Sequence, residues 1–529
     1  MKKGNLKTSP VMKEFILCLM PVCLLMFFLY ANESVAASSR IQVIVEGVEG
    51  EIKQNVLSFL SIEKQKDFDG LSDGFIRELH EKAPDEIRSA MQPFGYYNPI
   101  IRSSLKLVEE TWHAVYEIDK GEPVVVRELD LRLSGAGSGD RIFTRAVEEF
   151  PLKKGDILRH QEYEKGKRGL QQAAREYGYL DAVFTVHRVS VFPEVNAADV
   201  TIHFDTGARY RFGTVSFHQD TFSPELLQRF VPFKKGDPYV VMKIFQFQSA
   251  LRNSGYFSTV EVNTLSDRPE GHEVPVEVTL APVKRNRYSF GIGYGTDTGV
   301  RGSVGWENRY VNRRGHKMNA EARVSEIEDG VTSRYIIPLK STGPDHLDFT
   351  AGWERQHSET ADSKGMLAGV GLNQARRSWT RTVYLNYQLE DFEVADQSGR
   401  TSLLLPGITF TQIKADDRIY ASSGRRIIFD IKGAHTALLS DVSLLQAVVQ
   451  GRFIKAVGGF GRLIVRGKAG STVVDDFEDV PVSLRFFAGG DQSIRGYDYN
   501  SLGPVNDEGD VIGGRNILVG SMEYEQNIT

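Results

Sequence analysis

Cysteine is nearly absent from this sequence, and neither sign of charge is in large excess. Two cysteines, Cys18 and Cys23, occur in 529 residues, which excludes a disulfide framework and a cysteine-based zinc site. The 64 lysines and arginines are balanced by 69 aspartates and glutamates, and the formal net charge of −5 gives no support for a general nucleic-acid binder. Long apolar runs are absent after the first forty residues, which excludes a polytopic helical membrane protein.

The sequence also lacks the motifs of the common enzyme classes. It contains no G-x-S-x-G, no H-E-x-x-H and no P-loop, and its eleven histidines have no metal-ligand spacing. Gly291-Ile-Gly-Tyr-Gly295 lacks the third spaced glycine of a nucleotide fingerprint. The acidic segment 475–479 is interpreted either as a divalent-cation site or as a solvated loop. We therefore expect no enzymatic activity, no cofactor and no resident metal.

The N-terminal segment has the pattern of an export signal. Four lysines flank or precede an apolar stretch from Phe15 to Tyr30, and small residues follow up to Ala37. This order of charged, apolar and small residues predicts a cleaved signal peptide over residues 1–36, with an uncleaved signal anchor as the alternative. Both cysteines lie inside it, so we expect a mature chain without cysteine.

The segment from about residue 40 to 282 repeats itself. Phe150-Pro-Leu-Lys-Lys-Gly-Asp156 returns 81 residues later as Val231-Pro-Phe-Lys-Lys-Gly-Asp237. Gly-Tyr pairs at Gly95-Tyr96, Gly178-Tyr179 and Gly255-Tyr256 are spaced 83 and 77 residues apart. Self-similarity at such a period indicates three tandem modules, each a supersecondary unit.

Each module is predicted to contain a strand, two helices, the Gly-Tyr turn and two closing strands. We expect each glycine to end the second helix with a positive φ and each tyrosine to pack back on the sheet, which are structural roles. A small mixed sheet with two helices leaves strand edges exposed. The array is therefore either a binder of extended segments by strand addition or a spacer.

From Tyr288 onward, alternating segments of about ten residues replace the helical periodicity. Strands of nine to eleven residues span a bilayer when tilted, and their backbone is satisfied there only in a closed barrel. The pattern predicts an antiparallel transmembrane β-barrel, with a soluble β-sandwich or propeller as the alternative. The twelve strands that we expect are 288–296, 299–308, 317–326, 332–340, 345–356, 365–375, 378–390, 402–414, 424–435, 442–454, 460–474 and 515–528.

A loop of about forty residues separates the last two expected strands. Its segment Phe486–Tyr497 contains a Gly-Gly turn, flanking aromatics and a single arginine, in Ile494-Arg-Gly-Tyr497. If the loop folds into the barrel, Arg495 needs an acidic partner, because an unpaired buried guanidinium is costly. Glu523 on the next strand is the expected partner, whereas an exposed loop would leave Arg495 on the surface.

Three repeats with Lys-Gly-Asp and Gly-Tyr motifs resemble polypeptide-transport-associated (POTRA) domains. The hairpin Phe290–Gly299 and the loop Ile494–Tyr497 resemble the barrel of the BamA-like assembly superfamily. A set of three POTRA domains is similar to the TamA family, the outer-membrane subunits of translocation and assembly modules. BamA-like relatives usually carry five POTRA domains, and two-partner secretion transporters usually carry two.

The resemblance implies a bacterial outer-membrane barrel with periplasmic α+β POTRA domains, and an assembly and insertion factor for outer-membrane proteins. A client strand would pair at a lateral seam, and no nucleic acid or cofactor is implied. Its implied partners are a TamB-like inner-membrane-anchored periplasmic protein, outer-membrane and autotransporter client polypeptides, and the lipid bilayer. The residues implied for the seam are Phe290, Gly291, Ile292, Gly293 and Tyr294. The residues implied for the loop tip inside the barrel are Ile494, Arg495, Gly496 and Tyr497, with Glu523 as the acid that holds it.

The family barrel has sixteen strands, whereas the sequence pattern yields twelve before Thr529. We therefore expect an incomplete barrel, with a closed twelve-strand barrel as the alternative. Two further functions remain as alternatives, a two-partner-type polypeptide secretion pore and a passive diffusion channel. The expected domains are the signal peptide at 1–36, three POTRA domains at 38–122, 123–207 and 208–282, and the barrel at 283–529.

Overall fold

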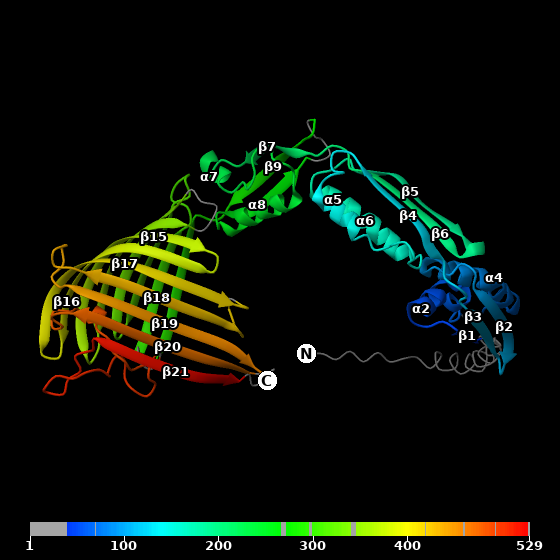
Figure 1. Ribbon diagram of the computed structural model, residues 1–529. Helices are drawn as coiled ribbons and strands as arrows, with labels where there is room; N and C mark the ends of the chain where they lie inside the picture. Colours follow the sequence, from blue (N-terminus) through cyan, green and yellow to red (C-terminus); the bar gives the residue numbers. More distant parts are fainter. Residues whose placement is uncertain are drawn as a thin grey trace, which may run out of the picture. The chain divides into compact units, whose positions relative to one another are not determined.

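The computed structural model describes residues 40–68, 70–265, 271–295, 299–339, 345–417, 419–458, 461–491 and 493–526 (Figure 1). The chain divides into two compact units, Met1–Tyr210 and Arg211–Thr529. The expected signal peptide at 1–36, with both cysteines, lies outside the described residues. No described helix is long and apolar enough to cross a bilayer.

Three small α+β repeats are present, as expected. The first consists of β1 (Arg40–Glu46), α2 (Gly50–Phe59), α3 (Ser61–Lys64), α4 (Asp73–Met91), η1 (Gln92–Phe94), β2 (Ile100–Val108) and β3 (Thr111–Asp119). The second consists of β4 (Val125–Ser134), α5 (Arg141–Glu148), α6 (His160–Glu176), β5 (Val183–Phe192), η2 (Pro193–Val195) and β6 (Ala197–Asp205). The third, in the second unit, consists of β7 (Arg211–His218), α7 (Pro224–Gln228), α8 (Val241–Asn253), β8 (Phe257–Thr264) and β9 (Glu273–Pro282).

The closing strand lies at the centre of each three-stranded sheet. The strand orders are β1-β3-β2, β4-β6-β5 and β7-β9-β8, with the first strand parallel and the second antiparallel to the central one. Each central strand alternates in burial, and its inward side chains, such as Tyr116, Phe204 and Val278, are fully buried against the helices. The apolar alternation in the sequence therefore marks the face that packs on the helices.

The Lys-Gly-Asp motifs form straps on the first strand of their own repeats. Gly155 donates to Val126 at 2.8 Å, and Val126 donates back to the carbonyl of Asp156 at 2.9 Å. In the third repeat, Gly236 and Phe212 form the equivalent bond at 2.8 Å. Both glycines have a positive φ, which the tight turn requires. The straps occupy part of the sheet edge at β4 and β7, so less of that edge is open to strand addition than the sequence suggests.

Each Gly-Tyr turn accepts a backbone hydrogen bond from the segment that follows its repeat. Gly95, Gly178 and Gly255 have φ of 91°, 87° and 74°. The carbonyl of Gly95 accepts from Val124 at 2.8 Å, and that of Gly178 accepts from Tyr210 at 2.7 Å. In the third repeat the carbonyl of Tyr256 accepts from Val283 at 2.9 Å. The turns therefore fix where each succeeding segment begins, a role that the sequence did not reveal.

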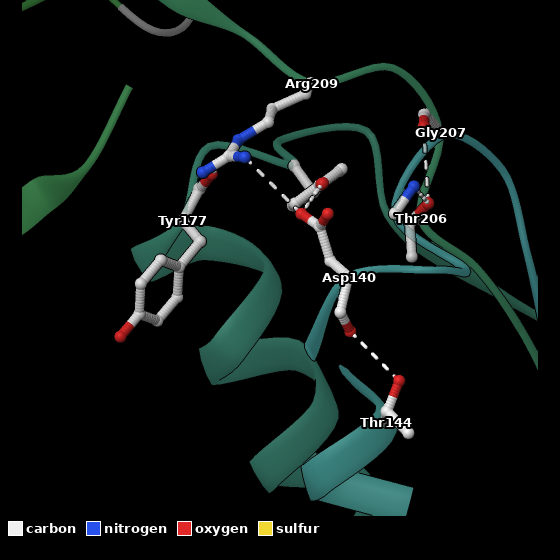
Figure 2. Close-up of polar contacts among 8 residues, drawn as sticks. Asp140, Thr144, Tyr177, Thr206, Gly207 and Arg209 are labelled. Carbon is white, nitrogen blue, oxygen red and sulfur yellow. Dashed lines mark hydrogen bonds and ion pairs between the residues drawn. The ribbon is translucent and has the colours of Figure 1, made fainter. Parts of the chain in front are cut away.

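Charged contacts reinforce this arrangement at the end of the second repeat (Figure 2). The guanidinium of Arg209 lies between two acceptors, the carbonyl of Tyr177 at 3.2 Å and the Asp140 carboxylate at 3.4 Å. It also lies 5.4 Å from the ring centre of Tyr179, whose hydroxyl donates to the same carboxylate. Burial and the neighbouring Asp140 raise the pKa of Tyr179 to about 12, so its hydroxyl keeps the proton that it donates. Arg209 thus holds the last residues of the first unit on the second repeat.

The contact between the first two repeats is expected to weaken in acid. His160 Nε2 lies 2.7 Å from the Tyr97 hydroxyl, and burial lowers the pKa of His160 below its usual value. Because the unfolded chain then binds the proton more readily, the stability contributed at neutral pH falls as the pH drops below about 6.5. We expect the thermal midpoint of the first unit to fall between pH 7.5 and pH 5.5.

His160→Gln should remove part of this pH dependence. Only a part is expected to disappear, because burial also lowers the pKa of His80 in the first repeat. A variant with the full wild-type pH profile would contradict the role of His160.

The second unit continues from the third repeat into one antiparallel sheet. Its order is β10 to β21 without interruption, which confirms the twelve expected strands. Their bounds are β10 (Asn286–Gly295), β11 (Gly299–Asn308), β12 (Lys317–Ser325), β13 (Glu328–Pro338), β14 (His346–His357), β15 (Ala361–Arg376), β16 (Trp379–Val394), β17 (Gln397–Ala415), β18 (Gly424–Ala434), β19 (Leu444–Val457), β20 (Gly461–Val474) and β21 (Asn516–Gln526). Within the described residues, β10 and β21 are each paired on one side only.

The two faces of this sheet differ in chemistry. The inner face is the one on which the loop 475–515 lies, as shown by the bond from Gln446 to the carbonyl of Leu484 at 2.8 Å. The opposite, outer face carries large exposed apolar side chains. Among them are Phe290, Ile292, Val304, Val331, Trp353, Met366, Leu385, Val449, Phe453, Leu518, Met522 and Tyr524. Apolar outside and polar inside is the arrangement of a transmembrane barrel wall.

The third repeat is attached to the end of the sheet where β12 begins. The Tyr256 hydroxyl donates to the carbonyl of Gly315 at 2.6 Å, inside the turn that joins β11 to β12. Lys317 donates to the carbonyl of Ser254 at 3.1 Å, and its ammonium lies 4.6 Å from the ring centre of Tyr256. The Gly-Tyr turn of the last repeat thus contacts the barrel sheet directly.

Candidate functional site

The first strand of the sheet, β10, is strongly exposed on its outer face and rich in glycine on its inner face. On its outer face, Phe290 is 80% and Ile292 is 92% exposed. On its inner face, Gly291 and Gly293 leave room for side chains of β11, because a Cβ at Gly291 would lie 2.6 Å from Ser303 Oγ. Glycine at these two positions leaves this part of β10 without an inner side chain to pack, which weakens a strand, whereas Arg287 and Ser289 face inward nearer its start. Its backbone therefore presents one unpaired edge, among the described residues, on a weakly packed strand.

The loop between β20 and β21 begins with a small apolar core of its own. Val480, Val482, Leu484 and Phe486 alternate in sequence and are at most 7% exposed. They pack against the inner face near the ends of β15 to β20, where buried side chains such as Leu403 are found. This period-two pattern was present in the sequence but fell inside an expected loop.

Arg485 is the buried polar centre of the first limb of this loop, the segment 478–486 that follows β20. Sequence reasoning missed it. Its side chain is 5% exposed and donates to the carbonyls of Val480 at 2.8 Å, Glu478 at 2.7 Å and Ile512 at 3.0 Å. A fourth bond, at 2.7 Å, reaches Gln397 Oε1 on β17. Burial lowers its pKa to about 10, which still leaves the guanidinium charged at neutral pH. The Arg485 side chain therefore joins the first limb of the loop, and the second limb that leads back to β21, to the sheet.

Glu390 fixes the same limb from the opposite side. Its carboxylate accepts from the backbone N–H of Ser483 at 3.1 Å and from the Ser483 hydroxyl. Glu390 is 2% exposed, and Gln388 donates to both Glu390 at 2.9 Å and Ser483 at 2.6 Å. Polar groups buried at this interface are thus paired with one another, as a stable buried network requires.

The loop tip contains the expected ion pair but is not buried. Arg495 Nη2 lies 3.2 Å from Glu523 Oε1, and the Arg495 side chain is 62% exposed. Ile494 and Tyr497 are 38% and 55% exposed, and Gly496 has a φ of 90°. The tip therefore lies on the inner face of the sheet, and its side chains are exposed to solvent there.

Glu523 has a second partner that the sequence reasoning did not consider. Arg466, diagonally across on β20, pairs with it at 3.0 Å and is 19% exposed. The carboxylate thus serves two guanidiniums, and the more buried of them belongs to the sheet. Arg466 was identifiable only through the strand register, which places residue 464 opposite Glu523 and Arg466 two positions further along.

Exchanging the charges of Arg495 and Glu523 is therefore expected not to rescue the loss seen in the single variants. From sequence alone, Arg495→Glu combined with Glu523→Arg should restore part of the function lost in either single variant. In the structure, Glu523→Arg places a second guanidinium beside Arg466, where the 3.0 Å ion pair now lies. Protease protection of the loop should remain as low in the double variant as in Glu523→Arg alone. Recovery to wild-type protection would show that Arg466 does not matter for the tip.

Comparisons with known proteins match nearly all the described regions. The family model described as "POTRA domain TamA domain 1" matches residues 42–120. The model "Surface antigen variable number repeat" (POTRA) matches 139–207 and 210–282, and the Omp85 superfamily domain matches 311–529.

Several known proteins are similar to this chain at low sequence identity. The outer membrane protein assembly factor BamA of Nitratidesulfovibrio vulgaris is 23% identical over 305 residues, which is 55% of this chain and 38% of that protein. Among solved structures, BamA from Haemophilus ducreyi lacking POTRA domains 1–3 aligns over 76% of this chain and 82% of that chain, with a TM-score of 0.63 and 16% identity. CdiB from Acinetobacter baumannii aligns over 91% of this chain and 86% of that chain at 15% identity, with a TM-score of 0.38.

The three repeat sheets, the twelve-stranded antiparallel sheet and the family matches agree with one another. The chain belongs to the BamA/Omp85 superfamily, as a protein with POTRA domains followed by a barrel domain.

Proposed function

We propose that this protein acts in a bacterial outer membrane as an assembly and insertion factor for β-barrel and autotransporter clients. The observation that carries the proposal is β10, a weakly packed strand with an apolar outer face and one backbone edge unpaired among the described residues. A client strand that pairs with this edge satisfies its own N–H and C=O groups before it enters hydrocarbon. The activity is mechanical, and it requires no covalent chemistry.

The POTRA domains are proposed to lie in the periplasm and to receive unfolded clients. The first repeat matches the TamA-type POTRA domain, which supports a TamB-like inner-membrane-anchored partner. Its outer strand β2 is largely exposed, with Ile100 61% and Leu107 54% exposed, and within the described residues one of its edges is unpaired and open to strand addition. The similar protein from N. vulgaris is named an outer membrane protein assembly factor, which supports the same class of activity.

Disulfide cross-linking tests the seam directly. Ile292→Cys on β10 should cross-link to a cysteine in the terminal strand of a client barrel during assembly. Val331→Cys is the matched control, because Val331 also points outward at 49% exposure but lies in β13, which is paired on both sides. Equal cross-linking at both positions would show that clients do not pair with β10.

A two-partner-type secretion pore is the alternative function. It would use the inner face as a conduit, and its client would be released rather than inserted. In that case cross-links would form at inner-face positions along the barrel, and Ile292→Cys would give none.

A further inference from the structure

Three arginines form a row across adjacent strands of the barrel sheet. In the strand register, Arg426 on β18 is directly opposite Arg452 on β19, and Arg452 is directly opposite Arg466 on β20. All three lie on the inner face, and these strands are neighbours (Figure 1). Like charges directly opposite one another destabilise a sheet. Such a row therefore costs stability unless an anion neutralises it.

The described part of the chain supplies one carboxylate to this row. Glu523 pairs with Arg466 at 3.0 Å, and it shares its charge with Arg495. The nearby Glu525 is already engaged bidentately by Arg462, whose Nε donates to Oε2 at 3.1 Å and whose Nη2 donates to Oε1 at 3.0 Å. No described carboxylate lies within ion-pair distance of Arg426 or Arg452. The Nε of Arg466 is buried and has no hydrogen-bond partner among the described residues.

A cavity of about 400 Å³ opens over the row, between the sheet and the loop. Besides the three arginines it is lined by the ammonium-bearing Lys468 and by Ser493 and Ser521 as hydroxyl donors. Lys468 is opposite Gln450 in the register, beside the row. A volume of this size falls in the range of small-ligand sites. The lining thus combines four cations with neutral donors.

We propose that this cavity binds a compact polyanion that carries phosphate or carboxylate groups. Guanidinium forks match both groups bidentately, and Lys468 adds a point charge. Arg426 and Arg452 are the recognition side chains that form no ion pair with a described carboxylate, although Glu525 lies within electrostatic range of Arg452. Arg466 is shared with Glu523. This ligand site goes beyond the assembly function proposed above and does not depend on client pairing at β10.

The site is connected to the loop tip through Glu523. A bound polyanion competes with Glu523 for Arg466, and Glu523 is the acid that also pairs with Arg495. Occupancy of the cavity therefore changes the charge balance that holds the tip. By reciprocity, any change that strengthens the pair of Arg495 and Glu523 also changes anion affinity.

Calorimetric titration of the purified full chain in zwitterionic detergent at low salt tests the proposal. Inorganic pyrophosphate and citrate are the probes, one for phosphate and one for carboxylate. At least one should bind with one-to-one stoichiometry, and Arg452→Gln should weaken that binding by about tenfold or more. Pyrophosphate alone identifies a phosphate ligand, citrate alone identifies a carboxylate ligand, and binding of both identifies a general polyanion site.

Arg425→Gln is the matched control, because it removes an arginine from β18, directly beside Arg426 of the row. Arg425 is opposite the outward-facing Phe453 in the register and so lies on the outer face. The Arg425→Gln variant should bind both probes as the wild type does. If Arg452→Gln fails to fold, Arg426→Gln at the end of the row replaces it. No saturable binding by the wild type, or equal weakening by Arg425→Gln, would overturn the proposal.

Discussion

Replacing Arg485 with alanine is expected to release the loop between β20 and β21 from the barrel. The guanidinium makes four bonds, and its loss leaves three carbonyls and the Gln397 amide oxygen without their donor. It also removes a cation that lies 4.9 Å from the Phe477 ring centre and 5.4 Å from that of Phe392. Buried acceptors left unpaired cost on the order of 3–5 kcal/mol in total. Limited proteolysis of residues 475–515 and the thermal midpoint of the barrel measure the loss.

Arg495→Ala is the matched control for this experiment. Both arginines lie in the same loop, but the Arg495 side chain is 62% exposed, and a solvent-screened ion pair contributes less than about 1 kcal/mol. Arg485→Lys should behave like Arg485→Ala, because a single ammonium does not reproduce the planar fork that serves four acceptors. A larger loss in Arg495→Ala than in Arg485→Ala would contradict the assignment of Arg485 as the anchor.

Replacing Gly315 with valine is expected to detach the third repeat from the barrel sheet. A Cβ at this position would lie 2.8 Å from the Tyr256 hydroxyl oxygen and 2.9 Å from Leu226 Cδ2, and the backbone has a φ of 73°. Overpacking costs roughly 1–3 kcal/mol, and the left-handed backbone adds about 1–2 kcal/mol for a β-branched residue. Trypsin should then cleave at Arg285, between the repeat and the sheet, where the guanidinium now lies 5.0 Å from the Tyr310 ring centre.

Gly236→Val separates the effect of steric overpacking from that of the strained left-handed backbone. Gly236 has a φ of 86°, but a Cβ there would meet nothing within 4 Å. This variant carries the backbone strain without the steric contact, so it should lower stability by about 1–2 kcal/mol and leave Arg285 protected. If both variants expose Arg285 to the same degree, the contact between Tyr256 and Gly315 does not hold the repeat in place.

The strands and repeats were predictable because their signals are local. Alternation predicted all twelve barrel strands, since a wall with an apolar outer face and a polar inner face has a period of two in the chain itself. The Gly-Tyr pairs likewise stood out by their spacing. Their positive φ follows from the chemistry of glycine, whereas their bonds to the next segment depend on contacts such as that of Gly178 with Tyr210.

The candidate site was only partly predictable because it depends on register and on a folded loop. The pair of Arg495 and Glu523 was predicted, but the shared partner Arg466 required knowledge of which residues are opposite across β20 and β21. Arg485 looked like any loop arginine, because its acceptors are mostly backbone carbonyls that no side-chain pattern reveals. The arginine row was likewise not predictable without the strand register, because its members are separated by 26 and 14 residues in sequence.

The proposed assembly function predicts that a client ends in the bilayer, whereas a secretion pore would release it across the bilayer. The decisive measurement reconstitutes the full chain in lipid vesicles and adds an unfolded β-barrel client from outside. The assembly account predicts a client inserted in the bilayer, shown by a heat-sensitive shift in its gel mobility and by protease protection of its strands. A client recovered as a soluble polypeptide inside the vesicle would contradict the account and would favour the secretion pore.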